Sequence, residues 1–160
     1  MFTIKAKNLH WINDVDDGED LCLHGHAVAV IGDEILEYED ATVSASALYL
    51  LKSLTEDHVI YEDNQMLPCC GFFMIPDGEL QNVTILGCPN GVDWSIKHDG
   101  NDVVLITESG KESRVSIEEY KKEVFRFVDE IEDFGDVDGD GIVRGQLLSH
   151  IFGSDGICPP

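Results

Sequence analysis

A stripe of regularly spaced apolar residues near the C-terminal end constrains this chain more than any other feature. The stripe consists of Ile117, Tyr120, Val124, Phe127, Ile131 and Phe134. Its alternating spacings of three and four residues place it on one face of a helix, and such a face must be buried. Ser116 before the run and Glu119 three residues later form a capping box that defines the helix start. The sequence therefore predicts an amphipathic helix over residues 117–134.

The chain before this helix is typical of strands separated by tight turns. Residues 2–6 alternate between apolar and polar side chains, which indicates a strand with one buried face. Leu21 to Ile31 is apolar on both faces, as in a central strand, and Gly32-Asp33 turns it into a short strand containing Ile35 and Leu36. Alanine and leucine after Ser44, a potential N-cap, predict a helix over about 44–55.

Regularly spaced turns dominate the region between the two helices. Glycine, asparagine and aspartate mark turns at 76–79, 88–91, 99–102 and 108–111, which is typical of hairpins. We therefore expect an α+β fold, with one antiparallel and curved sheet of about 7–8 strands and two main helices, at about 44–55 and 117–134. A chain of this length buries enough surface for one core. Residues 1–134 are expected to form a single α+β domain, and residues 135–160 an acidic loop with a short C-terminal extension.

The charge of the chain restricts the partners that it can bind. Acidic residues number 32 and basic residues 10, for a formal net charge of −22. This balance argues against nucleic acids and anionic membranes, which need a basic surface. It favours cations and basic proteins, although high charge also serves solubility, and salt adaptation would give a similar composition.

The cysteines and the hydropathy of the chain suggest a compartment. No segment is apolar enough to span a bilayer, and residues 1–5 do not resemble the start of a signal peptide. The five cysteines are odd in number, and two of them, Cys69 and Cys70, are adjacent. This pattern favours reduced thiols over a disulfide framework, so we expect a cytoplasmic protein.

The loop after the second helix resembles the EF-hand calcium loop. Asp136, Asp138, Asp140 and Gly141 match the first, third, fifth and sixth loop positions, and Ile142 offers the backbone carbonyl of the seventh. Arg144 and Leu147 stand at positions nine and twelve, so the bidentate glutamate of the family is missing. The resemblance implies at most weak calcium binding through Asp136, Asp138, Asp140 and Ile142. The alternative is an Asp/Gly-rich turn that ends the helix.

A second group of candidate ligands lies on the predicted central strand. Cys22, His24 and His26 alternate along it, so their side chains project from one face and could converge on a transition metal. No Cys-x-x-Cys or His-Glu-x-x-His spacing supports such a site, and paired histidines on a strand are more often structural. Cys70 with His24 or His58 as base could form a catalytic pair, but those residue types occur in most chains. We therefore predict no catalytic residues.

The end of the second helix concentrates negative charge. Seven acids and no base lie between Asp129 and Asp140. Those on the helix, which we expect to contact a partner, are Asp129, Glu130, Glu132 and Asp133.

In size and charge the chain also resembles small acidic bacterial proteins, some of which are immunity proteins that neutralise a basic toxin. This resemblance implies a non-catalytic acidic binding protein that docks a basic partner through fast, salt-sensitive association. The alternatives are a weak calcium-binding module and a metal- or thiol-dependent enzyme.

Overall fold

A computed structural model of the chain describes residues 1–11, 23–61, 65–69, 73–76, 83–86 and 90–137. The strands are β1 (Phe2–Trp11), β2 (Leu23–Ile31), β3 (Glu34–Thr42), β4 (Phe73–Pro76), β5 (Val83–Leu86), β6 (Trp94–Asp99), β7 (Asp102–Thr107) and β8 (Glu112–Ser116). The helices are α1 (Val43–Lys52) and α2 (Ile117–Val137). The α+β class and the two main helices are therefore confirmed, but the prediction of one large sheet is wrong.

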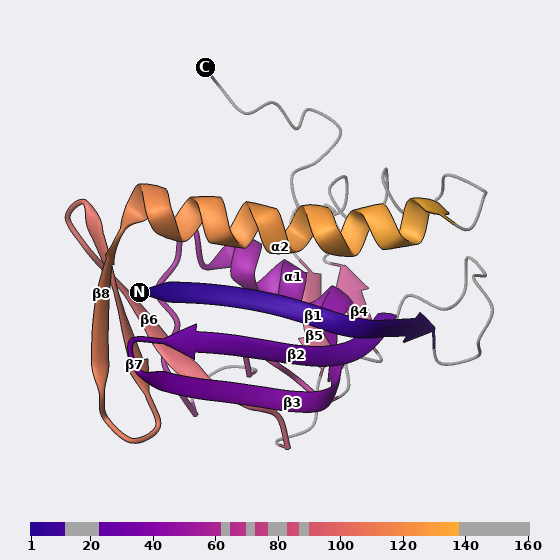
Figure 1. The fold of residues 1–160 in the computed structure, drawn as a ribbon, viewed down its shortest axis with the longest axis horizontal. Coiled ribbons are helices and arrows are strands. Elements are labelled where there is room, and N and C mark those ends of the chain that lie inside the picture. Colours follow the sequence, from indigo (N-terminus) through magenta and orange to yellow (C-terminus); the bar gives the residue numbers. More distant parts are fainter. Residues whose placement is uncertain (12–22, 62–64, 70–72, 77–82, 87–89, 138–160) are drawn as a thin grey trace.

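The strands form separate antiparallel sheets, in the orders β1-β2-β3, β4-β5 and β6-β7-β8. Figure 1 shows α2 running alongside β1, at the edge where a further strand would have to pair. Turn spacing identifies the hairpins, but it does not reveal which edges a helix covers, so the sequence did not predict the division into sheets. The two larger sheets share one local order, since three consecutive antiparallel strands run directly into a helix in β1-β2-β3-α1 and again in β6-β7-β8-α2.

The start of α2 has the predicted capping box. The Glu119 amide donates to Ser116 Oγ at 3.3 Å, and the Ser116 amide donates to the Glu119 carboxylate at 3.4 Å. At α1 the cap differs from the prediction. Thr42 is the N-cap and makes no side-chain capping bond, whereas Ser44 is buried inside the helix.

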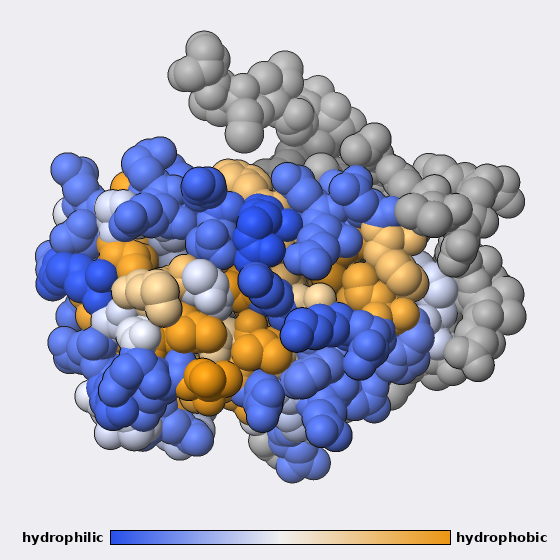
Figure 2. All heavy atoms as spheres, viewed as in Figure 1, coloured by the Kyte–Doolittle hydropathy of each residue, from blue (hydrophilic) through white to orange (hydrophobic). Residues whose placement is uncertain are grey.

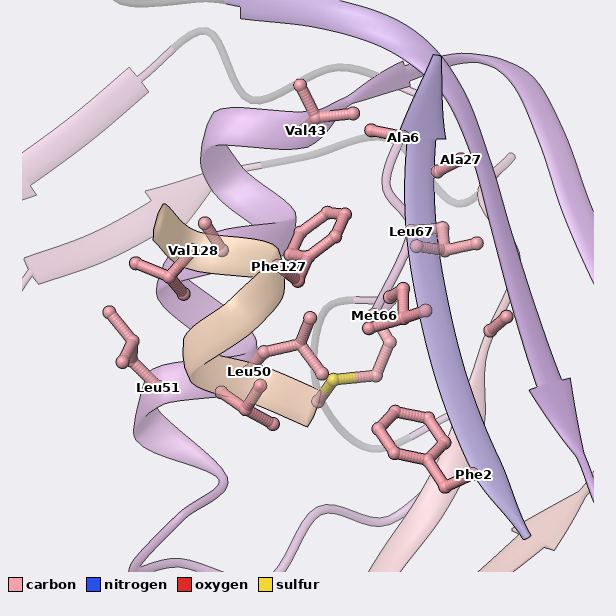
Figure 3. Packing of buried hydrophobic residues seen from close by; sticks show 14 of the residues in the cluster. Phe2, Ala6, Ala27, Val43, Leu50, Leu51, Met66, Leu67, Phe127 and Val128 are labelled. Atoms are coloured by element: carbon pink, nitrogen blue, oxygen red, sulfur yellow. The ribbon is translucent and has the colours of Figure 1, made fainter. Parts of the chain in front are cut away.

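The core is formed by the inner face of β1-β2-β3, the two helices and buried side chains of β6, β7 and β8. Small side chains line this face, including Ala6, Ala27 and Ala29, and all three are buried. Because alanine projects little from a strand, the helices can lie close to the sheet and fill the space with large side chains. Figure 3 shows Phe127 of α2 between α1 and β1. The predicted apolar stripe of α2 is therefore the part of the helix that packs, with Tyr120, Val124, Phe127 and Ile131 all buried.

Two phenylalanines of α2 allow a matched test of this packing. Phe127 is fully buried and Phe125 is 40% exposed. We expect Phe127→Ala to lower the free energy of unfolding by about 3–5 kcal/mol, because it removes a large buried side chain and leaves a cavity. Phe125→Ala, the control on the same helix, should lower it by about 0.5 kcal/mol or less. Urea denaturation measures both, and equal losses would contradict the assigned face.

Candidate functional site

The two histidines predicted as metal ligands do share one face of β2, but they are bound to different partners. His24 Nδ1 lies 3.1 Å from Asp40 Oδ1, and His24 Nε2 lies 3.3 Å from Thr42 Oγ1. His26 Nε2 lies instead 3.3 Å from the Glu37 carboxylate. Cys22 is outside the described residues. Within the described ranges, no three His, Cys, Asp or Glu side chains are grouped so that they could hold a metal ion.

The buried histidine of this pair has both ring nitrogens engaged. A proton on His24 Nδ1 would be donated to Asp40, and the Thr42 hydroxyl could then donate to Nε2. His10 of β1 also approaches Asp40, with Nε2 at 3.7 Å from Oδ1. Asp40 therefore connects β3 to both neighbouring histidines. Sequence reasoning identified neither His10 nor Asp40, because strand pairing alone brings them together.

His58, considered above as a general base for Cys70, forms a buried pair with Asp93. The two side chains meet at 2.8 Å, and Asp93 also accepts a hydrogen bond from the Met66 amide at 3.1 Å. The His58 backbone bonds to Ile96 of β6 in both directions. The pair thus fastens the segment after α1 to β6. Cys70 lies outside the described residues, so the proposed nucleophile–base geometry is not tested.

Most of the predicted calcium loop is also outside the described residues. Asp138, Asp140 and Ile142 fall there, and Asp136 is known only as a backbone position near the end of α2. The calcium site therefore stays a prediction.

The acidic end of α2 is less uniform than the sequence suggested. Asp129, Glu130 and Asp133 are exposed, but Glu132 is only 6% exposed and does not contribute to the surface. Arg126, one turn before, lies 3.3 Å from Glu130 and 3.0 Å from Glu123. This cation offsets part of the negative charge that the helix end carries.

The structure reveals an open groove that sequence reasoning missed. It occupies about 610 Å³ beside the start of β3 and is lined by Glu34, Ile35, Leu36, Tyr61, Glu108 and Ser109. Two of its apolar side chains face solvent, with Ile35 67% and Tyr61 78% exposed. An exposed isoleucine and tyrosine beside a groove are the side chains that protein interfaces bury.

The aromatic wall of the groove is held in an unusual position. Tyr61 has a φ of 69°, in the left-handed region that a bulky side chain seldom adopts. Its hydroxyl donates to the Glu108 carboxylate at 2.5 Å, and this bond raises the pKa of Tyr61. The hydrogen bond thus orients the Tyr61 ring. Because the two residues lie far apart in the sequence, no local motif could reveal their contact.

Glu34, an acidic residue that lines the groove, joins the two larger sheets through its side-chain contacts. Ser109 Oγ donates to Glu34 at 2.7 Å, and Lys111 Nζ lies 3.4 Å from the same carboxylate. Hydrogen bonds from the hydroxyls of Thr107 and Ser109 lower the pKa of Glu34 below its ordinary value. Glu34 is therefore ionised in the groove at neutral pH.

Cys69 differs from the expectation of reduced thiols. It is disulfide-bonded, and its partner lies outside the described residues. The prediction of a wholly reduced chain is therefore wrong at this position. The number and spacing of the cysteines misled because they do not reveal which thiols the fold brings within bonding distance.

Comparison of the chain with protein-family models, with curated proteins and with solved structures finds no match. No helix in the described part of the chain is long and apolar enough to cross a membrane.

The bonds to Glu34 predict a pH dependence. Its folded-state pKa lies below the ordinary value of 4.5, so the unfolded chain binds the proton more readily. The free energy of unfolding should therefore fall as the pH drops from 4.5 through the folded-state pKa. In Glu34→Gln the free energy of unfolding should fall less over this pH range, and urea denaturation from about pH 6 to about pH 3 measures the difference. Glu39→Gln controls for the change in net charge, and an unchanged profile in Glu34→Gln would contradict the assignment.

The disulfide predicts the number of reactive thiols. The chain contains five cysteines, and a single disulfide removes two of them. We expect at most three to react with a thiol reagent in denaturant without reductant, and all five after reduction. Five reactive thiols before reduction would refute the bond at Cys69.

Proposed function

We propose that this chain is a non-catalytic acidic binding protein of the inhibitor or immunity type, and that it docks a basic protein partner. The observation that carries the proposal is the groove beside β3, where exposed Ile35 and Tyr61 lie with the carboxylates of Glu34 and Glu108. Apolar side chains provide the area that an interface buries, and surrounding carboxylates select a basic partner.

The net charge supports the same kind of partner. At −22 the chain attracts cations over long distances and speeds their encounter, and salt weakens this attraction. Two exposed acids at the end of α2, Asp129 and Glu130, add to this field. The exposed apolar pair Ile35 and Tyr61 lies at the groove, so we assign Asp129 and Glu130 to steering and the groove to contact.

The disulfide at Cys69 indicates the kind of compartment in which the chain would bind such a partner. Reducing conditions in the cytoplasm disfavour structural disulfides, so the bond at Cys69 fits an oxidising compartment better than the cytoplasm that the sequence suggested.

A pull-down from native lysate tests the proposed function. We expect the immobilised chain to retain a basic protein at low salt and to release it at about 0.5 M salt, where charges are screened within a few ångströms. An unrelated protein of similar negative charge serves as the control for general cation exchange. Recovery of no basic protein beyond those held by the control would count against the proposal.

A further inference from the structure

The two outer edges of the β1-β2-β3 sheet differ in what covers them. Along β1 runs α2, and the Arg126 guanidinium donates to the Ile4 carbonyl of that strand. β3 is the other outer strand, and no strand within the described ranges pairs with its outer edge. Only at its end does the Thr42 amide donate to the Pro68 carbonyl, at 2.9 Å. An uncovered strand edge presents backbone groups that a further strand can use.

The turn before β3 determines which backbone groups face outward. Ile31 and Glu34 pair across the two-residue turn of Gly32 and Asp33, and Gly32 has the φ of 64° that such a turn needs. Residues that flank a two-residue turn bond to each other, and the pattern alternates along an antiparallel pair. The N–H and C=O groups of Ile35 and Glu37 therefore point away from β2, toward the open edge.

The side chains beside this edge define the chemistry of a matching strand. On the outer face, exposed Ile35 pairs with Val30, and Glu37 and Glu39 follow along β3. Figure 2 shows apolar surface in the middle of this face, surrounded by hydrophilic side chains. The groove, which Ile35 lines together with Leu36 and Tyr61, lies at the same end of β3. An incoming strand would thus meet apolar side chains near the turn and carboxylates farther along.

Charge also disfavours the pairing of this edge with a second copy of the chain. Lys5 and Lys7 lie on β1, at the far side of the same sheet, so the acidic side chains are confined to the β3 side. Two copies of β3 placed edge to edge would bring their glutamates together, which is unfavourable. The edge therefore favours a basic strand of another protein over a second copy of this chain.

We propose that the β3 edge, defined here as residues 34–41, binds an extended basic segment of a partner polypeptide by strand addition. The backbone groups of Ile35 and Glu37 provide the hydrogen bonds, and Glu37 and Glu39 select lysine or arginine. This inference rests on the proposed function and specifies how the partner is held.

The probe for this inference is a synthetic peptide of alternating lysine and valine. On adding it to the ¹⁵N-labelled full chain, we expect slower hydrogen exchange of the Ile35 and Glu37 amides. A peptide N-methylated on its edge-facing residues keeps every charge but loses the hydrogen bonds, and should give no such protection. Equal protection by both peptides, or protection confined to other amides, would overturn strand addition.

Charge reversals locate the binding surface. Glu37→Lys with Glu39→Lys should raise the dissociation constant of the lysine–valine peptide by about tenfold or more, since a factor of ten corresponds to about 1.4 kcal/mol. Asp129→Lys with Glu130→Lys makes the same change in charge at the end of α2 and should raise it by less than about threefold. All four residues are exposed, so both variants should fold, as circular dichroism would verify.

The outcomes separate this inference from the function on which it rests. If only the α2 reversal weakens binding, strand addition at β3 is wrong while an acidic docking protein stands. If the lysine–valine peptide does not bind at low salt and the pull-down also recovers no basic protein, both proposals fail.

Discussion

Burial of the apolar face of α2 is the interaction on which the rest of the structure depends. The helix contacts β1, β7 and β8 as well as α1, so one element joins both larger sheets to the core. Each large side chain on its face contributes about 1.5–3 kcal/mol through burial. The stripe also brings one polar group into the core, the hydroxyl of Tyr120. This hydroxyl forms a hydrogen bond with Ser53 Oγ at 2.7 Å. That bond satisfies the hydroxyl, and burial raises the pKa of Tyr120.

The position of α2 explains why, within the described part of the chain, the β1 edge of the sheet is covered and the β3 edge is not. A helix that must bury its stripe against β1 also covers the edge of that strand, and Arg126 satisfies the Ile4 carbonyl there. β3 lies at the opposite side of the sheet, beyond the reach of α2. The acidic side chains of β3 discourage pairing between identical chains, which is a common protection of strand edges. The same charges would attract a basic strand, so protection and recognition are compatible.

Polar contacts between the two larger sheets shape the groove beside β3. Glu34 receives a hydrogen bond from Ser109, and the N-terminal amine of Met1 donates to Ser113 at 3.2 Å. Tyr61 is held over the groove by Glu108 despite its unfavourable backbone angle. Residues held in rare backbone conformations concentrate at functional sites, which agrees with a contact role for this surface. The groove therefore depends on both sheets and on the segment after α1.

Local spacing in the sequence determined the helices, the capping box, most hairpins and the acidic character of the chain. These features depend on side chains a few residues apart, so periodicity and turn chemistry reveal them. Tertiary structure alone decided that the strands divide into separate sheets and that Glu132 is buried while the acids Asp129, Glu130 and Asp133 are exposed. It also decided that Ile35, Tyr61 and Glu108 line one groove. The physical reason is that sheet edges, burial and grooves arise from contacts between distant segments, and no local pattern encodes which segments meet.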